Sequence, residues 1–354
     1  MRIALVGNWP RPYGGVSVHV AALTRALRLR GVDVRVLDIG EGDHAGDGVE
    51  PARGPLRCTA ALAAVAAEGR LVHLHTNGAN TRSWLVALAA GRARRPLAPR
   101  GVLTLHSGSA PGYLRGRPGR RQLAAAACAG FGHVIAVNGE IAEELRRCGV
   151  PPSRVTVVPP FSPAQLEAID PPDGVAAFRA GHGPVLAAAL LASPLYGADL
   201  LLAAFGALRR TSPRAGLVLF GAGTDGPPFR APGVLGLGEI GHEAALGVLQ
   251  AADVFVRPTR VDGDSVSVRE ALALGCRVVA SDVGHRPAGC LLFPVGDAAA
   301  LAARLREAVE GGRPGPGLPG EDPFDAIVAT YRALWPDGGA DRSGPCRAAG
   351  RLRT

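Results

Sequence analysis

Short apolar runs alternate with stretches of helical pattern along most of this chain. The runs 2–7 and 32–40 enclose the segment 16–30, whose apolar residues recur with helical spacing. The same alternation begins again in the second half, with apolar runs at 216–223 and 252–259. Strands that alternate with helices predict a parallel sheet covered by helices on both faces. We therefore expect an α/β chain with two doubly wound parallel-sheet units in tandem, facing each other across a central cleft.

A change in composition marks the expected domain boundary. The segment 161–183 is rich in proline and lacks long helical periodicity, so it is interpreted as a linker. We predict a Rossmann-like N-terminal domain over 1–160 and a second Rossmann-like domain over 184–321. The segment 322–335 has the pattern of one last helix. The end of the chain, 336–354, contains too little apolar material to fold, and we expect a disordered tail.

The composition excludes several kinds of site. The 39 basic residues are all arginine, so the chain has neither a Schiff-base lysine nor a Walker-type phosphate loop. The 6 cysteines are scattered without C-x-x-C spacing, which argues against a disulfide framework or a zinc site. Residues 1–15 have too short an apolar stretch for a signal peptide, and no run reaches the roughly 18 apolar residues of a membrane span. We expect a soluble, cytoplasmic protein.

Two candidate ligand-binding positions lie in the N-terminal half, where strands end and helices begin. Gly14 and Gly15 precede the helical segment that starts at Val16, so a ligand can approach the backbone and the free N–H groups of the first turn favour an anion. An ordinary turn is the alternative, and the stretch lacks the G-x-G-x-x-G pattern of dinucleotide binding. His106 follows the apolar run 102–105, where it either faces the cleft or lies in a surface loop.

The third candidate is the stretch RPTRVDGDSVSVREALALG at 257–275, which contains the end of a strand, a loop and a helix. The helix is expected from Ser265 onward, capped by either Asp264 or Ser265, so that its first N–H groups and the positive end of its dipole face the cleft. Arg257 and Arg260 flank the loop.

Asp262 and Glu270 are separated by 7 residues in this stretch. Glu270 lies in an otherwise apolar helical run, and a buried charge is costly unless something binds it. A carboxylate can accept hydrogen bonds from both hydroxyls of a ribose, which would explain its place beside the cleft. A structural ion pair with an arginine is the alternative.

These motifs together resemble the retaining glycosyltransferases of family 4. The resemblance depends on Gly14-Gly15, on His106, on FGAG at 220–223, and on the acidic pair of the segment 257–275, which is followed by CRVVASDVG at 276–284. It extends over roughly residues 1–335, and the segment 257–275 is most similar to a bacterial branch of the family. The resemblance implies the GT-B fold, with the acceptor on the N-terminal domain and a nucleotide-sugar donor on the C-terminal one.

The resemblance also implies roles for individual residues. Glu270 would hold the ribose, Asp262 the hydroxyls of the donor sugar, and His106 would lie beside the reacting sugar, which makes these three the catalytic set. The last helix would cross back onto the N-terminal domain. No cofactor and no metal are expected. The donor-binding residues would be Gly14, Gly15, Arg257, Arg260, Ser265, Val266, Ser267 and Glu270.

Three departures from the family pattern bear on these roles. Asp262 stands where the family has glutamate, and Asp264-Ser265 stands where Phe-Gly is usual. Tyr196-Gly197 stands where the family has the Lys-Gly that contributes to diphosphate binding. Because the charge on the leaving diphosphate must still be compensated, Arg257 and Arg260 are the expected substitutes.

The resulting expectation is a retaining glycosyltransferase in cell-envelope or exported polysaccharide or glycolipid synthesis, with a carbohydrate or lipid-linked acceptor. A nucleotide-sugar epimerase or hydrolase, or a catalytically silent nucleotide-sugar-binding protein, is the alternative. No nucleic-acid partner is expected. A cluster of arginines in the N-terminal half indicates either contact with the anionic inner face of the cell membrane or a solvated basic face. Its members are Arg92, Arg94, Arg95, Arg100, Arg115, Arg117, Arg120 and Arg121.

Overall fold

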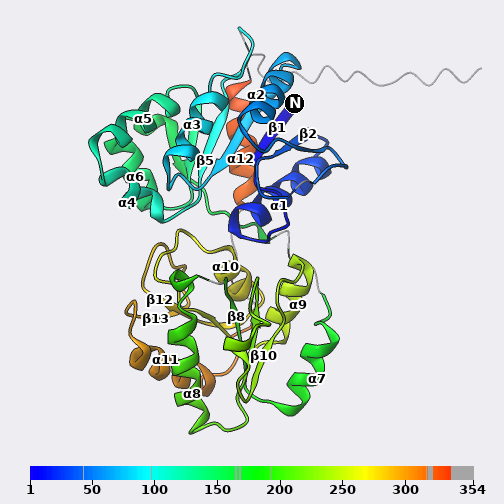
Figure 1. The fold of residues 1–354 in the computed structure, drawn as a ribbon, viewed down its shortest axis with the longest axis vertical. Helices are drawn as coiled ribbons and strands as arrows, with labels where there is room; N and C mark the ends of the chain where they lie inside the picture. Colours follow the sequence, from blue (N-terminus) through cyan, green and yellow to red (C-terminus); the bar gives the residue numbers. More distant parts are fainter. Residues whose placement is uncertain are drawn as a thin grey trace, which may run out of the picture.

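The protein folds into two α/β units, which lie one above the other in Figure 1. The computed structural model describes residues 1–335 except 43, 97, 164–165, 167–168, 192, 316 and 318–321. Each unit is built on one sheet, with strand order β3-β2-β1-β4-β5-β6-β7 in the first and β10-β9-β8-β11-β12-β13 in the second. All neighbouring strands pair in parallel. The predicted pair of parallel-sheet domains is confirmed.

In the first unit the strand order reverses between β1 and β4, which is where such sheets bind ligands. Its strands are β1 (Arg2–Gly7), β2 (Asp33–Asp38), β3 (Val49–Pro51), β4 (Leu71–Thr76), β5 (Val102–Leu105), β6 (His133–Ala136) and β7 (Val155–Val157). Its helices are α1 (Gly15–Leu29), α2 (Pro55–Ala67), α3 (Thr81–Ala90), α4 (Ser109–Arg115), α5 (Pro118–Cys128) and α6 (Gly139–Arg147), with a short 3₁₀ turn, η1 (Pro152–Arg154).

In the second unit the reversal falls between β8 and β11. Its strands are β8 (Val185–Ala189), β9 (Gly216–Phe220), β10 (Val234–Gly236), β11 (Val254–Arg257), β12 (Arg277–Ser281) and β13 (Cys290–Phe293). Its helices are α7 (Asp173–Gly181), α8 (Ala198–Arg209), α9 (His242–Ala251), α10 (Val266–Ala273) and α11 (Ala298–Glu310), with the 3₁₀ turns η3 (Pro194–Tyr196) and η4 (Pro227–Phe229).

Strands in the middle of each sheet, such as β1, are mainly apolar because helices cover both faces of the sheet. In β1, Ile3 and Leu5 point to the face covered by α1, whereas Ala4 and Val6 point to the opposite face and pack in the cluster that contains Trp84 of α3. All five side chains are fully buried. This two-sided burial explains why these strands form nearly continuous apolar runs instead of alternating with polar residues.

The last helix, α12 (Pro323–Leu334), returns to the first unit. Its buried residues Phe324, Ile327, Val328 and Tyr331 have the spacing of one helix face and share a cluster with the residues of β1 and α1. Figure 1 shows α12 beside β1 in the upper unit, although α11, the helix before it, belongs to the lower unit.

The segment 161–183 is not a linker throughout, because it contains α7. Val175 of this helix is fully buried in the second unit, in a cluster with residues of β8 and β9. The sequence pattern did not predict the helix because Val175 is its only buried residue, so no apolar stripe develops. The expected tail 336–354 lies outside the described residues. Within the described part of the chain, no helix has the length and apolarity to cross a membrane.

Candidate functional site

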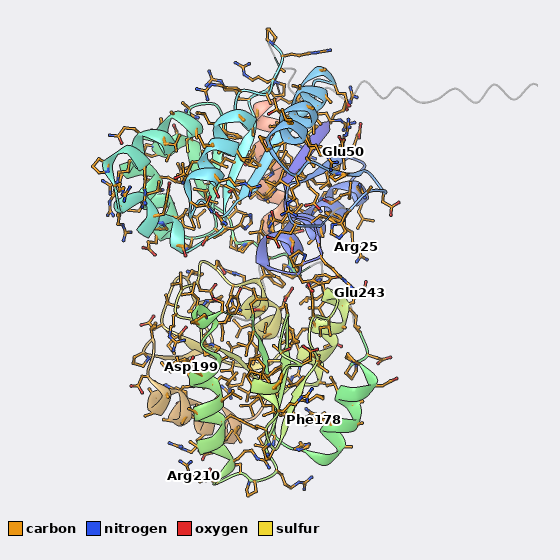
Figure 2. All side chains as sticks on the ribbon, in the orientation of Figure 1. Arg25, Glu50, Phe178, Asp199, Arg210 and Glu243 are labelled. Atoms are coloured by element: carbon orange, nitrogen blue, oxygen red, sulfur yellow. The ribbon has the colours of Figure 1, made fainter. Side chains whose placement is uncertain are left out.

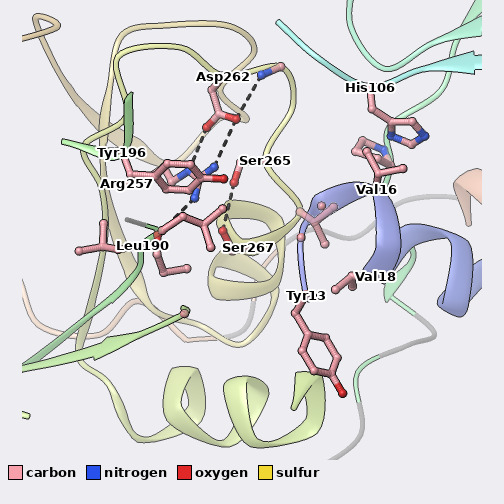
Figure 3. Close-up of a pocket in the computed structure, with 18 of the residues that line it drawn as sticks. Tyr13, Val16, Val18, His106, Leu190, Tyr196, Arg257, Asp262, Ser265 and Ser267 are labelled. Carbon is pink, nitrogen blue, oxygen red and sulfur yellow. Dashed lines mark hydrogen bonds and ion pairs between the residues drawn. The ribbon is translucent and has the colours of Figure 1, made fainter. Parts of the chain in front are cut away.

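A cavity of about 390 Å³ lies between the two units, at the carboxyl ends of both sheets. The first unit contributes the start of α1 and the loop after β5, and the second contributes the loops after β8 and β11 and the start of α10. Figure 3 shows His106 and Val16 on one side of the cavity and Arg257, Asp262 and Ser265 on the other. The topological switch points of both sheets therefore open into the same space.

The N-terminus of α1 borders the cavity. Gly14 is the N-cap of this helix and Gly15 its first residue, and both line the cavity. A Cβ atom added to either glycine would meet nothing within 4 Å, so packing inside the protein does not require glycine at these positions. The space in front of them is open to a ligand, which could approach the helix N-terminus closely.

The N-terminus of α10 borders the cavity from the second unit. Ser265, one of the two predicted capping residues, is the N-cap and makes no capping hydrogen bond with its side chain. Instead its hydroxyl lies 3.1 Å from that of Ser267, and both serines and Val266 line the cavity. The preceding Asp264 is held by a bidentate ion pair with Arg269, both contacts being 2.6 Å. The first turn of α10 thus presents a second helix N-terminus to the cavity.

Glu270 lines the cavity and is otherwise buried. Its Oε1 accepts a hydrogen bond of 2.6 Å from Nε2 of His242, the first residue of α9. The partner is therefore a histidine, not the arginine of the alternative interpretation. Burial lowers the pKa of His242, but the hydrogen bond and charge of Glu270, with the charge of Glu243, outweigh burial and raise that pKa above its usual value.

The carboxylate of Asp262 accepts hydrogen bonds from several protein groups. Its Oδ2 accepts from Nε of Arg257 at 2.9 Å, from Nη1 of Arg286 at 3.0 Å and from the hydroxyl of Thr259 at 3.2 Å. Its Oδ1 accepts from the Gly263 N–H at 3.1 Å and has a long contact of 3.4 Å with Arg257. Burial would raise the pKa of Asp262, but the two arginines outweigh it and lower the pKa to about 2. The carboxylate is therefore ionised and anchors both arginines.

The structure separates the two arginines that were expected to bind diphosphate. Arg257 ends β11, lines the cavity, and has its guanidinium carbon 5.1 Å from the ring centre of Tyr196. Arg260 is not among the residues that line the cavity. It forms a bidentate ion pair of 2.7 and 3.0 Å with Asp199, near the start of α8. Figure 2 labels Asp199. The loop directs its side chain toward α8, so this geometry does not support its assignment to the donor site, which stays a prediction.

His106 lies on the wall of the first unit, in a group of four histidines with His19, His73 and His75. Its Nε2 is 3.2 Å from Nδ1 of His75. Burial, together with the neighbouring histidines, holds the pKa values of His73, His75 and His106 well below the usual range. These imidazoles are neutral near pH 7, so His106 can exchange hydrogen bonds with a ligand without adding a charge to the cavity.

Two glycines allow the units to touch beside His106 and Asp262. A Cβ on Gly108 would lie 1.7 Å from the carbonyl oxygen of Asp262, and one on Gly263 would lie 2.4 Å from that of His106. The amide of Asn138 also donates across the junction to the Gly263 carbonyl, at 3.1 Å. These close approaches bring His106 and Asp262 to the same end of the cavity.

Sequence reasoning missed several residues of the site. His242 and Arg286 bind the two predicted carboxylates. The backbone N–H of Tyr13, in the first unit, donates to Glu239 of the second unit at 3.0 Å, and both residues line the cavity. The stretch that contains His242 has no recognisable motif, and only its place at the start of a helix after Gly241 could have drawn attention to it.

The two units define the class of protein. Both consist of one doubly wound parallel sheet, and a ligand-sized cavity lies between their carboxyl ends, which is the GT-B architecture. Residues 13–163 match the family model of Glycosyltransferase Family 4, and residues 184–310 match that of Glycosyl transferases group 1. Together these matches include most of both units. The chain belongs to the GT-B glycosyltransferases.

Solved structures confirm the fold. HepE (Alr3699) from Anabaena, in complex with UDP, is 18% identical with a TM-score of 0.63, and the match covers 95% of this chain and 96% of that one. Sucrose-phosphate synthase from Thermosynechococcus elongatus is 20% identical with a TM-score of 0.65, covering 94% and 98%. A putative UDP-N-acetylglucosamine 2-epimerase from Listeria monocytogenes is 16% identical with a TM-score of 0.62, covering 94% and 96%. No curated protein sequence matches significantly.

Proposed function

We propose that this protein transfers a sugar from a nucleotide-sugar donor to an acceptor hydroxyl, with retention of the anomeric configuration. The observation that carries the proposal is the combination of groups around the cavity: two helix N-termini, one arginine with a side chain only 11% exposed, and one buried glutamate. The first three suit a diphosphate, and the glutamate suits sugar hydroxyls. The structures of HepE with UDP and with UDP-glucose support a donor of this class.

The diphosphate would lie between the N-termini of α1 and α10, close to Arg257. Arg257 and Arg286 carry two positive charges and Asp262 one negative charge, so the three groups leave one net positive charge beside the cavity. This charge and the two helix ends would replace the lysine that the family has where Tyr196 stands in this chain. They would stabilise the charge that grows on the leaving diphosphate in the transition state.

Glu270 would bind the ribose of the donor. One of its oxygens is engaged by His242, which leaves the second for hydroxyl groups. Asp262 has less free capacity, because Oδ2 already accepts from three donors. We therefore assign it chiefly to holding Arg257 in place, with Oδ1 available to one hydroxyl of the donor sugar.

Retention does not require a protein nucleophile in this proposal. The bond between the anomeric carbon and the diphosphate oxygen breaks, and the acceptor oxygen bonds to the same carbon on the same face. The acceptor proton passes to the leaving diphosphate oxygen, so charge and atoms balance. His106 would lie beside the reacting sugar as a neutral hydrogen-bonding group. The transfer would need no metal.

The acceptor would be a carbohydrate or a lipid-linked sugar, bound on the side of the first unit. We place the reaction in cell-envelope or exported polysaccharide synthesis, on the cytoplasmic face of the membrane. Several members of the arginine cluster are already engaged: Arg115 and Arg121 form ion pairs with Glu144, and Arg120 stacks over Tyr113. The charge available to an anionic membrane is therefore smaller than the sequence suggests.

The test is a thermal-shift screen of the purified protein against a panel of nucleotide sugars. A donor at about one hundred times its dissociation constant adds roughly 2.7 kcal/mol to the free energy of unfolding. Each donor that shifts the melting temperature is then incubated with and without acceptor sugars, and the release of nucleoside diphosphate and the anomeric configuration of the product are measured by NMR.

Acceptor-dependent release with a retained configuration is the expected result. Conversion of the donor without any acceptor would indicate the epimerase or hydrolase. Binding without turnover of any donor would indicate a silent nucleotide-sugar-binding protein, and an inverted product would exclude the retaining mechanism.

A further inference from the structure

Three histidines from separate elements meet in the wall of the first unit. His19 comes from α1, His75 from β4 and His106 from the loop after β5. One ring nitrogen of each lies within 4.8 Å of the others, and Nδ1 of His75 is 3.2 Å from Nε2 of His106. His19 and His75 are buried, whereas His106 reaches the cavity. The cluster is therefore enclosed on one side and accessible from the cavity on the other.

Two of these histidines have ring nitrogens without a partner in the described structure. Nδ1 of His19 lies 2.9 Å from the carbonyl oxygen of Pro160, so it must carry the proton, and Nε2 is left with a bare lone pair. Nε2 of His75 is also buried without a partner. The fourth histidine of the group differs: His73 uses both ring nitrogens, with the hydroxyls of Tyr331 at 2.5 Å and Thr104 at 2.7 Å.

Buried polar atoms in native proteins are nearly always satisfied, and a bare imidazole lone pair is a metal ligand. The structure assigns a binding site for a divalent transition-metal ion of the zinc class to His19, His75 and His106. This site differs from the expectation of no metal and shares His106 with the proposed donor site, so its test measures metal binding and not sugar transfer. Its ligands are neutral imidazoles, which suit Zn²⁺, Co²⁺, Ni²⁺ or Cu²⁺. The cluster contains no carboxylate, so Mg²⁺ and Ca²⁺ are not expected to bind.

Two further features suit such an ion. The His19 N–H donates to a backbone carbonyl, which is the usual way in which a protein orients a metal-binding imidazole. The face toward the cavity leaves room for a fourth ligand from solvent, as in open three-histidine zinc sites. Ligand atoms of a tetrahedral zinc ion are about 3.3 Å apart, since each lies about 2.0 Å from the metal. The candidate ligand atoms of the three histidines lie within 4.8 Å of one another, so they would have to approach by up to about 1.5 Å to bind one ion.

The experiment uses the full chain without a histidine tag, stripped with a chelator that is then removed. Co²⁺ is added and visible absorption is followed, and Zn²⁺ is then added as competitor. We expect one Co²⁺ per chain with the d–d spectrum of a tetrahedral nitrogen site, displaced by Zn²⁺ and not by Mg²⁺. His19→Gln and His75→Gln should each weaken Co²⁺ binding by more than about tenfold, the smallest loss typical of removing even an outer-shell partner.

His182→Gln is the matched control. His182 lies in the second unit, bonded to the Phe178 carbonyl and remote from the cluster, so this variant should bind Co²⁺ like the parent. Circular dichroism of each metal-free variant checks its fold, and His106→Gln at the cavity wall replaces any variant that does not fold. Failure to bind Co²⁺ or Zn²⁺, a thiolate charge-transfer band that indicates cysteine ligation, or unchanged affinity in the folded cluster variants would overturn the assignment.

Discussion

Asp262 and Glu270 lie in the same wall of the cavity but in different kinds of surroundings. Asp262, in the loop after β11, accepts hydrogen bonds from two arginines, a hydroxyl and a backbone N–H. Glu270, one turn into α10, has a single described partner, His242. Both side chains are close to fully buried, with exposed fractions of 11% and 7%.

The difference separates two uses of a buried carboxylate. A carboxylate accepts about four hydrogen bonds, so Asp262 is nearly saturated by the protein itself and acts mainly as an anchor. Glu270 lines the cavity and has no described partner on its second oxygen, so it retains the acceptor capacity that binding a ligand requires. Loss of Asp262 should therefore reduce stability first, and loss of Glu270 should reduce ligand affinity first.

Asp262→Asn should have the largest effect. It leaves Arg257 and Arg286 buried without a counter-charge, which typically costs about 3–5 kcal/mol of the free energy of unfolding. Because folding lowers the pKa of Asp262 to about 2, the stabilisation in the parent is present above pH 4 (roughly the unfolded value) and disappears as the pH falls through about 2. Urea unfolding at pH 7 and at pH 3 measures the stability loss in Asp262→Asn and the pH dependence of the parent. Unchanged stability of Asp262→Asn at pH 7 would show that the charge of Asp262 is not needed to hold the two arginines.

The second prediction concerns the arginine that Asp262 holds. Arg257→Ala should weaken nucleoside diphosphate by about 10- to 150-fold, the equivalent of roughly 1.5–3 kcal/mol for a charged hydrogen bond. The bare nucleoside should lose much less affinity, because it lacks the phosphates. Isothermal titration calorimetry of the variant with nucleoside diphosphate and with the bare nucleoside measures both losses of affinity.

Arg260→Ala is the matched control for this variant. It removes an arginine three positions further along the chain, which pairs with Asp199 on the surface and does not line the cavity. Exposed ion pairs contribute little, so both affinities should stay within about twofold of the parent. An equal loss of diphosphate and nucleoside in Arg257→Ala would show that Arg257 is structural, and a diphosphate-specific loss in Arg260→Ala would return that arginine to the site.

The sequence was sufficient for the fold because its strongest signals are local. Apolar runs such as 2–7 are nearly continuous since strands such as β1 are buried on both faces, and helices alternate with them regularly. The exception is α7, whose single buried residue Val175 leaves no periodic pattern. The ends of the predicted strands also indicated several residues of the cavity wall, since ligands of parallel sheets bind where strands end. Gly14, His106 and Ser265 all line the cavity.

The partners of those residues could not be predicted in the same way. His242 is 28 positions from Glu270, and Arg286 is 24 from Asp262, so only the packing of α9 and of the loop after β12 brings them together. Arg260 shows the converse. It lies three positions from Arg257, yet its side chain forms an ion pair with Asp199, which is 61 positions away. Arg257 and Arg260 are close in sequence, but only Arg257 lines the cavity, and the local sequence pattern does not predict this difference.

The third prediction tests the free capacity of Glu270. Glu270→Gln keeps the size of the side chain but weakens charge-assisted acceptance, and donor affinity should fall by about 10- to 150-fold. Melting should change much less than in Asp262→Asn, because no arginine loses its partner. Calorimetry with the donor and a thermal melt of the same sample measure both. If the melting temperature falls as far as in Asp262→Asn while donor affinity is unchanged, Glu270 has the same stabilising role as Asp262 and does not bind the donor.

The last prediction is the smallest in effect and concerns His242, the one partner of Glu270 among the residues that the structure describes. Folding raises the pKa of His242, because the hydrogen bond and charge of Glu270 and the charge of Glu243 outweigh burial. A histidine with a raised pKa contributes its full stabilisation below the unfolded value of about 6.5 and loses it as the pH rises through the folded value. The difference in the free energy of unfolding between the parent and His242→Gln should therefore be larger at pH 5.5 (about one unit below that value) than at pH 9.

Glu243→Gln is the control for this variant, since it removes the weaker charge and keeps the bond between His242 and Glu270. It should retain most of the pH dependence of the parent. Urea unfolding of the three proteins at both pH values makes the comparison. An equal difference between the parent and His242→Gln at the two pH values would mean that the imidazole does not gain a proton from the proximity of Glu270. In that case Glu270 would be held by a neutral hydrogen bond alone, and its charge would be more fully available to a ligand.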